Sequence, residues 1–241
     1  MKPTTTMKAF IAFLFLAGAG LMGSCIPGEG VKGDGNVVKE ERTVKDFSVL
    51  EVSSAFKVFL RQGSSVSLAV EADQNLMAMI KTEVKGNTLR IYTTDNIKSA
   101  EELNIYLSFK ELEAIDISGA VDLEGEGLMT FGELNLDCSG ASELQLSLNA
   151  EKIDASISGA SHIALSGEVP LTVFDMSGAS KINAFDLVVK TCELDVSGAA
   201  EARVNASESL KVDVSGAAAV RYKGSPKILS DISGAGSLKA E

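Results

Sequence analysis

Residue types that usually serve catalysis or sugar stacking are scarce in this chain. It contains no tryptophan, three tyrosines and one histidine, His162, which falls at a polar position expected to face solvent. No Ser/His/Asp set, HExxH motif or phosphate-binding loop occurs. The sequence therefore predicts that the protein is not an enzyme. Five phenylalanines are expected in the core or at bends: Phe56, Phe59, Phe131, Phe174 and Phe185.

Basic residues are outnumbered by acidic ones. The chain has 22 Lys and Arg against 33 Asp and Glu, a formal net charge of −11. Removal of residues 1–24 takes away two lysines and no acid, which leaves −13. Such a surface argues against a nucleic-acid partner and against binding to anionic lipid by charge. It suits a solvated envelope protein, or one that collects cations.

Only one long apolar run occurs, Ala9–Ala17, and it is too short to span a membrane. Lysines precede it, and small residues lead from it to Cys25, which is the arrangement of a secretory signal. A cysteine at this point resembles the lipobox of bacterial lipoproteins, with Met22 at the position where that pattern has leucine. An ordinary signal peptide with an incidental cysteine is the alternative.

The lipobox resemblance implies how the chain is anchored. Residues 1–24 would be a signal peptide, and Cys25 would become the acylated first residue of the mature protein. Two or more acyl chains give stable membrane anchoring. We therefore expect a lipid anchor in the outer membrane, on its periplasmic face or at the cell surface. Residues 25–36 are expected to form a flexible tether.

The most prominent feature of the chain is one three-residue motif that occurs seven times. Ser-Gly-Ala recurs from Ser118 to Ala235 at intervals of 18 to 21 residues. A nearly constant period of this kind indicates stacked supersecondary units. Glycine can turn the chain without a Cβ clash, so each copy predicts a corner. The corner glycines are Gly119, Gly140, Gly159, Gly178, Gly198, Gly216 and Gly234.

Polar and apolar residues alternate on both sides of every corner. The residue before each serine is apolar, from Ile117 to Ile232, and so is the third residue after each alanine, from Leu123 to Leu238. A period of two is typical of a strand with one buried face. Each copy therefore predicts one strand that ends at the corner and a second strand that follows it.

Coils of this kind predict an all-β fold, a β-solenoid (single-stranded parallel β-helix) of about seven regular coils over residues 118–241. Each coil would bury its apolar face against its neighbours at a strand spacing of about 4.8 Å. A β-sandwich is the competing interpretation, because closely spaced strands and turns also suit that fold. The agreement of the corners, position by position, favours the solenoid.

Residues 37–117 lack the Ser-Gly-Ala motif but are rich in strand signals. We expect an irregular β-rich part that continues the solenoid or caps it, since an open solenoid end exposes unpaired backbone groups. One helix is predicted over residues 73–81, with Asp73 as a candidate cap.

The scarcity of cysteine excludes a disulfide framework. Cys138 and Cys192 both fall on inward positions, about three strand spacings or roughly 14 Å apart along the stack. A disulfide needs Cα atoms within about 7 Å. Both are therefore predicted to be small, buried, free thiols.

An acidic residue stands two positions before most of the serines. If the coils stack in register, these carboxylates line one face about one strand spacing apart, interrupted only by Ser156, with the seven serine hydroxyls in an adjacent row. Such a face is a candidate ligand or cation surface, and rows of oxygen ligands could hold calcium. Alternatively each carboxylate is solvated or accepts hydrogen bonds from the backbone of the corner. The residues are Asp116, Asp137, Asp175, Asp195, Asp213 and Asp231.

Several segments together resemble a known family. They are Gly33-Asp34-Gly35, residues 42–47, residues 56–63, residues 84–91 and then the repeated Asp-x-Ser-Gly-Ala motif. This order is similar to the putative auto-transporter adhesin, head GIN domain family, over about residues 33–240. The resemblance implies a secreted or lipid-anchored β-solenoid of a Gram-negative envelope that acts as an adhesin-like binding module.

Two other functions stay open at this stage: a carbohydrate-active β-helix enzyme and a purely structural envelope protein. A deep groove with two or three acids in a non-repeating arrangement would favour the enzyme, whereas a flat and regular exposed face would favour binding. Host or matrix glycans and proteins are candidate partners. Exposed solenoid ends are also predicted to be able to pair into a homodimer.

Overall fold

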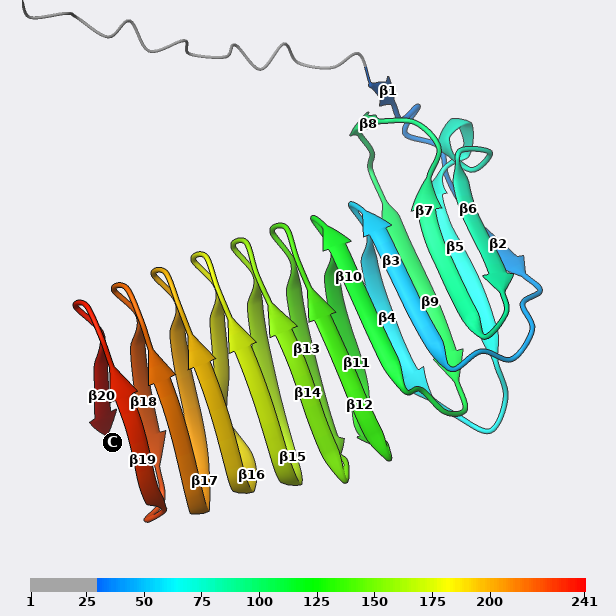
Figure 1. The fold of residues 1–241 in the computed structure, drawn as a ribbon. Coiled ribbons are helices and arrows are strands. Elements are labelled where there is room, and N and C mark those ends of the chain that lie inside the picture. Colours follow the sequence, from blue (N-terminus) through cyan, green and yellow to red (C-terminus); the bar gives the residue numbers. More distant parts are fainter. Residues whose placement is uncertain (1–29) are drawn as a thin grey trace, which may run out of the picture.

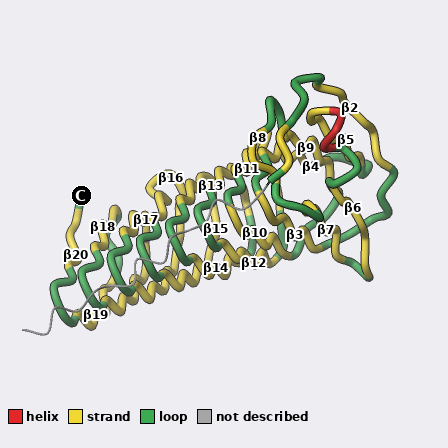
Figure 2. Tube along the Cα trace, turned by 90° about the horizontal axis from the view of Figure 1, so that it is seen from above, coloured by secondary structure: helices red, strands yellow, loops and turns green. Residues whose placement is uncertain are grey.

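The structure is a computed structural model that describes residues 30–241. The predicted signal peptide and Cys25 lie outside the described residues. The chain forms a rod of stacked coils with a broader unit at one end (Figure 1). Seen along the perpendicular direction, the coils form one continuous row (Figure 2). Among the described residues no helix has the length and hydropathy needed to cross a membrane.

Each coil contributes one strand to each of two layers. We call the layer whose strands run into the corners the leading sheet, and the layer whose strands run out of them the trailing sheet. In the middle of the rod β15, β16 and β17 bend from the trailing into the leading layer without a break, so 18 strands count as one folded sheet. All pairings between successive coils are parallel. The predicted β-solenoid is confirmed.

The regular coils begin with β10 (Ala114–Gly119) and β11 (Asp122–Thr130). Buried residues alternate with more exposed ones in β10 and at both ends of β11, as the period-two pattern predicts, and a register irregularity interrupts β11 between Glu124 and Leu128. The strands that follow are β12 (Glu133–Cys138), β13 (Glu143–Asn149), β14 (Lys152–Ile157), β15 (His162–Met176), β16 (Lys181–Val196), β17 (Glu201–Val214), β18 (Ala219–Lys223), β19 (Lys227–Ile232) and β20 (Ser237–Ala240).

Every corner glycine has a positive φ and lies on the corner before it. A Cβ at Gly198 would lie 2.7 Å from the carbonyl oxygen of Gly178. That carbonyl accepts a hydrogen bond from the N–H of Ala199 at 2.8 Å, and the same bond recurs between the other corners. Glycine is therefore required twice, for its backbone conformation and for the close approach of the next corner.

An eighth copy of the corner precedes the seven that the Ser-Gly-Ala motif identifies. β3 (Val49–Ser54) leads to a turn at Ser54, and β4 (Lys57–Gln62) follows it. β3 pairs in register with β10, and β4 pairs with β11. Ser54 is the one non-glycine residue with a positive φ in the described chain. Its side chain is accommodated because it meets Thr93, at 2.9 Å between the two hydroxyl oxygens, instead of another corner.

A further, irregular coil lies on the N-terminal side of β3 and β4. It is made by β7 (Thr88–Thr93), which pairs in parallel with β3, and β9 (Leu103–Phe109), which pairs in parallel with β4. In the chain, β3 and β4 come before β7 and β9, but in space the coil of β7 and β9 lies farther from the regular coils. The chain then crosses from β9 to β10, on the other side of β3 and β4. Residues 37–117 both continue the solenoid and cap it.

Antiparallel strands close the N-terminal end of the rod. β6 (Ile80–Lys85) pairs with β7, β5 (Ser67–Asp73) pairs with β9, and β2 (Val37–Arg42) pairs with β5. β1 (Val31–Lys32) pairs with β8 (Ile97–Ser99) above them. The expected tether over residues 25–36 is therefore corrected: residues 31–35 are held to the cap by β1 and by the hydrogen bond from Gly35 N–H to Asp73.

The helix predicted over residues 73–81 is wrong. Only a single 3-10 turn, Gln74–Leu76, occurs there, and β6 starts at Ile80. The guanidinium of Arg42 donates to the carbonyl oxygens of Met77 and Ile80, at 3.2 and 2.7 Å, so these groups are satisfied without a helix. Asp73 makes no side-chain cap; its buried carboxylate accepts the N–H groups of Gly35 and Glu101 instead.

Cys138 and Cys192 are both buried and free, as predicted. Cys138 aligns with Ile157 and Cys192 with Thr172, at different positions along the coil. Burial raises the pKa of each thiol to about 12. Both cysteines therefore act as small apolar side chains within the stack.

Candidate functional site

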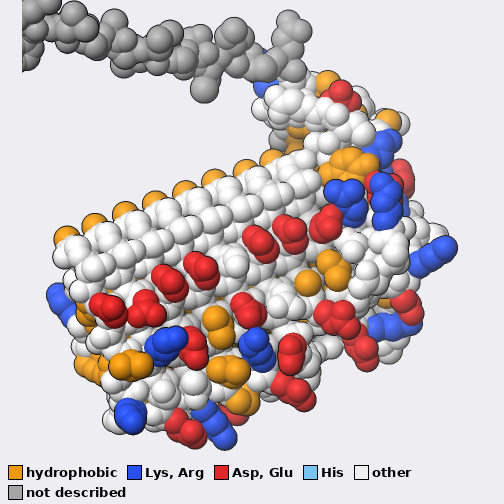
Figure 3. Space-filling model, viewed as in Figure 1, with side chains coloured by type: hydrophobic (Ala, Val, Ile, Leu, Met, Phe, Trp, Pro, Cys, Tyr) orange, Lys and Arg blue, Asp and Glu red, His pale blue; other side chains and the backbone are white. Residues whose placement is uncertain are grey.

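The acidic residues before the corners lie in one straight row on the leading sheet. Strand pairing aligns Asp116 with Asp137, Asp137 with Ser156, and Ser156 with Asp175. The row continues through Asp195, Asp213 and Asp231 in consecutive coils. We call this row the acidic ladder. Figure 3 shows it as a line of acidic side chains that runs parallel to the row of corners.

All six aspartates of the acidic ladder are exposed. Within residues 30–241 their carboxylates make no ion pair and accept no side-chain or corner hydrogen bond. The corner amides that they were proposed to bind are used otherwise, because the alanine N–H of each corner donates to the preceding corner. The ladder therefore presents solvated carboxylates at the spacing of the strands, about 4.8 Å.

A carboxylate at the head of the row is paired with an arginine. Glu51 of β3 aligns with Asp116 and extends the acidic ladder by one coil. Its Oε2 lies 2.6 Å from Nε of Arg90, which is the aligned residue of β7. Sequence analysis missed Glu51 because its corner has serine in place of glycine. The signal was present: Glu51-Val52-Ser53-Ser54-Ala55 keeps the acid, the apolar residue and the small corner residues in order.

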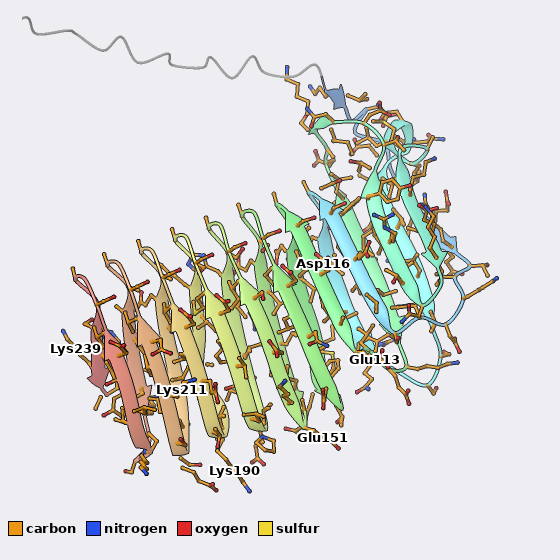
Figure 4. All side chains as sticks on the ribbon, viewed as in Figure 1. Glu113, Asp116, Glu151, Lys190, Lys211 and Lys239 are labelled. Atoms are coloured by element: carbon orange, nitrogen blue, oxygen red, sulfur yellow. The ribbon has the colours of Figure 1, made fainter. Side chains whose placement is uncertain are left out.

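Partial burial and like-charged neighbours change the titration of the carboxylate at the capped end. Partial burial raises the pKa of Asp116, and the neighbouring Asp137 and Glu51 carboxylates raise it further. Asp116 points away from the rod on the leading sheet (Figure 4). Like charges one strand apart destabilise each other, so a bound cation or a cationic partner would relieve that repulsion.

The serine row beside the acidic ladder serves the stack. The hydroxyls of Ser139, Ser197 and Ser233 donate to carbonyl oxygens of Ile117, Met176 and Val214, at 3.2 to 3.4 Å. Each of these three bonds joins a coil to the one before it. At these corners the serine hydroxyls are engaged within the stack, whereas the carboxylates beside them are available to a ligand.

Other outward rows of the leading sheet contain ion pairs. Lys211 lies 3.4 Å from Glu193 in the preceding coil, and Lys152 lies 3.2 Å from Asp154 in its own strand. Charges of both signs therefore occur there, whereas the acidic ladder carries one sign. No three His, Cys, Asp or Glu side chains in the described part of the chain gather as a metal site would require.

The trailing sheet bears a shallow hollow over Ala164. The hollow measures about 270 Å³ and is bordered by His162, Lys181, Asn183 and Arg203. It arises because a small alanine stands in a row of longer side chains. His162 is exposed at its rim, as the sequence predicted.

A second hollow lies where the solenoid meets the cap. Phe59 and Tyr106 stack there on the outer surface, with ring centroids 5.1 Å apart, and Lys39 Nζ lies 3.4 Å from the Tyr106 centroid. Arg61 and Ser108 border the same hollow of about 640 Å³. Phe56, Phe131 and Phe174 are buried as predicted, but Phe59 and Phe185 are only half-buried. Phe59 is displaced from the core because it occupies an outward position of β4.

Comparison with known proteins identifies the architecture. The model of the family "Putative auto-transporter adhesin, head GIN domain" matches residues 46–226. A crystal structure of a putative adhesin from Bacteroides fragilis NCTC 9343 matches with a TM-score of 0.82 and 22% identity, over 88% of this chain and all of that one. No curated protein matches the chain.

Two structures from Parabacteroides distasonis ATCC 8503 match over the same shares of the chains, 88% and 100%. One is a putative adhesin, with a TM-score of 0.73 and 25% identity. The other is a putative lipid binding protein, with a TM-score of 0.72 and 23% identity. These likenesses show that the capped solenoid is a recurring fold.

Proposed function

Because the chain belongs to the putative auto-transporter adhesin, head GIN domain family, we propose that it is a cell-envelope lipoprotein that binds extracellular partners through the acidic ladder. The family is one of putative adhesins and not of enzymes. The observation that supports the proposal is the register of the ladder: six exposed carboxylates without partners among the described residues, on a surface built from similar coils. A regular, flat row of this kind favours binding over catalysis.

The proposed mechanism is multivalent. Every regular coil except the one with Ser156 offers an aspartate at the same position, so a partner with repeated groups contacts several coils at once. Many weak contacts then add through the high effective concentration of the second and later contacts. The stacked backbone fixes the spacing of the carboxylates, which reduces the entropic cost of ordering them on binding. The partners proposed are host or matrix glycans and proteins, with calcium as a bridging ion for anionic ones.

We also propose that acylated Cys25 anchors the protein in the outer membrane. Residues 31–35 are attached to the cap, so residues 26–30 are the span between the anchor and the folded body. The cap would then lie next to the membrane and the acidic ladder would extend away from it. Metabolic labelling with a fatty acid, in wild type and Cys25→Ala, tests the anchor.

Binding of residues 26–241 to arrays of glycans and matrix proteins, with and without calcium, tests the ligand face. This segment retains every contact described here, because all of them lie within residues 30–241. The test variant changes Asp137, Asp175, Asp195 and Asp213 to Asn. The matched control changes four exposed acids outside the ladder, each without an ion pair: Glu143→Gln, Glu168→Gln, Asp186→Asn and Glu208→Gln.

Saturable binding that the ladder variant loses and the control keeps is the expected result. Equal loss in both variants would mean that the ligand recognises only the net charge of the protein. Binding that survives both changes would move the ligand site away from the acidic ladder. Absence of binding in every condition would overturn the adhesin function for these classes of partner.

A further inference from the structure

The two ends of the rod are finished differently. At the N-terminal end, antiparallel strands cover the first coil completely. At the other end β19 pairs only with β17, and β20 pairs only with β18. Within the described residues no strand lies on the far side of either, so both present an open backbone edge. Figure 1 shows these two strands as the last layer of the rod.

Apolar side chains are uncovered at this end. Ile228 is 39% exposed and Ile232 is 42% exposed, whereas the aligned residues one coil earlier, Leu210 and Val214, are 0% and 3% exposed. These are core positions that lack only the next coil. Leu229, on the outer surface of β19, is 69% exposed. An uncovered edge with apolar side chains is a surface that proteins usually protect or pair.

We propose that the open end pairs with the open end of a second copy of this chain, with β19 antiparallel to its counterpart about a two-fold axis at Leu229. Such pairing continues both layers across the interface, because an axis along the sheet normal keeps outward residues outward and inward residues inward. It also supplies hydrogen-bond partners to the open edges. The same surface meets itself, as in other two-fold dimers.

The charges of β19 match this arrangement. A two-fold axis at Leu229 places Lys227 of each copy opposite Asp231 of the other, as directly facing residues about 5 Å apart. Neither side chain makes an ion pair within residues 30–241. The sequence Lys-Ile-Leu-Ser-Asp is therefore complementary to itself when reversed. A parallel arrangement would instead bring like charges together.

The end face is small, which sets the expected strength. Strands of about 20 Å in two layers about 10 Å apart, with their side chains, present on the order of 400 Å² per copy. This is about half of the area of a standard interface. We therefore expect a dissociation constant in the micromolar range or weaker. This inference is independent of the ligand proposed for the acidic ladder, although Asp231 is shared by both surfaces.

Sedimentation equilibrium of residues 26–241, from about 5 µM to about 1 mM, tests the pairing. Lys227→Asp and Asp231→Lys each place like charges together, so each alone is expected to weaken association at least tenfold. An equimolar mixture of the two variants restores both opposite-charge pairs and is expected to associate again. All three positions face outward on β19, so the fold is retained, which circular dichroism verifies.

Leu229→Lys is expected to abolish association, because the two side chains meet at the axis. The control is Leu128→Lys, which changes an equally accessible leucine, 61% exposed, on β11 far from the end. A chain that stays monomeric throughout the concentration range overturns the proposal. So does association that the β19 variants leave unchanged, or a mixture that fails to recover it. The ladder variant of the preceding section retains Asp231, so loss of ligand binding and loss of pairing are measured separately.

Discussion

Arg90 of β7 and Glu51 of β3 form an ion pair, with 2.6 Å between Nε and Oε2, at the head of a row of unpaired carboxylates. The pair places a positive charge beside the row at the point where the solenoid meets its cap. Beyond it, each aspartate of the acidic ladder faces another carboxylate or Ser156. The cap thus matches the charge of the coil that it covers as well as its backbone edge.

Removal of that pair should have a small and salt-dependent cost. Arg90→Gln is expected to lower the free energy of unfolding by roughly 0.5 kcal/mol at low ionic strength, because both partners are partly exposed. A double-mutant cycle with Glu51→Gln, followed by urea denaturation, measures the coupling. At about 1 M salt the coupling should approach zero. A coupling that persists there would mean that packing and not charge joins the two residues.

Asp116→Asn should stabilise the protein at neutral pH. The pKa of this carboxyl is raised by its partial burial and by Asp137 and Glu51, so its ionised form opposes folding. The sign follows directly: the wild type gains stability as pH falls through the raised native pKa, and the gain is complete below the unfolded value of about 4.

The expected difference is a few tenths of a kcal/mol at pH 7 and none below about pH 4, since the side chain is exposed. Chemical denaturation of both proteins at several pH values measures it. Asp186→Asn, which removes an exposed acid outside the ladder, serves as the control for the loss of one charge. A destabilised Asp116→Asn at pH 7 would contradict repulsion along the ladder.

Corner glycines should tolerate no side chain. In Gly159→Ala the new Cβ would collide with the carbonyl of Gly140 and the residue would keep a positive φ, so a loss of at least about 3 kcal/mol is expected. Gly86→Ala provides the control, because Gly86 also has a positive φ but open space around it, and should cost about 1 kcal/mol. Thermal or urea unfolding compares them.

Ser54→Gly also tests whether glycine is required at a corner because of the close approach of a neighbouring corner. This position has no corner beneath it, so glycine is permitted there without being required. The change relieves the positive φ of Ser54 and removes its hydrogen bonds with Thr93, and the two effects should cancel to within about 1 kcal/mol. A large loss would show that the serine holds the cap on the first coil.

Asp73→Asn should loosen the cap. The two carboxylate oxygens accept the N–H groups of Gly35 and Glu101, and an amide offers only one oxygen. Backbone hydrogen bonds lower the pKa of Asp73 despite the opposing effect of its burial. Stability from this group is therefore present above the unfolded pKa of about 4 and is lost as pH falls through the lower native value.

We expect the melting temperature of Asp73→Asn to fall by several degrees at pH 7. Hydrogen exchange should locate the loss at residues 33–35 and 100–102, while the coils beyond β10 keep their protection. The difference between the variant and the wild type should shrink in acid. Equal loss of protection along the whole rod would contradict a local role.

Cys138 and Cys192 should react with thiol reagents only when the rod opens. Burial raises both pKa values to about 12, so almost no thiolate exists at pH 8. Labelling of residues 26–241 should therefore be slow in buffer and immediate in denaturant, with about two thiols modified. Fast labelling of one cysteine under native conditions would reveal local opening of its coil.

Much of the solenoid could be predicted because each coil repeats the same local rules. The alternation around Ile117 and Leu123, and the glycine between them, define two strands and a corner without reference to any distant residue. Stacking in register then follows from repetition, and it brings Asp116, Asp137 and Asp175 into one row. The ladder was predictable for the same reason.

The cap was not predictable to this detail because its order in space differs from its order in the chain. β7 and β9 lie before β3 and β4, and no local pattern specifies that exchange. The apolar spacing of Leu76, Met77 and Ile80 suits a helix, but Arg42, from a distant strand, satisfies the carbonyls that a helix would use. Exposed solenoid ends were expected from the sequence, but which side chains of β19 lie uncovered there follows from the register with β17, which only the assembled rod reveals.

The orientation of the backbone bonds also determines how the rod responds to force. Strands lie across its long axis, so the hydrogen bonds between coils run along the axis. Tension applied through the whole last layer would load all bonds of one interface together, as a clamp does. Tension applied to Glu241 alone would peel β20 and then β19 away, a few bonds at a time. The rod is therefore expected to resist force that is spread over the whole last layer better than force that is applied to the C-terminal residue alone.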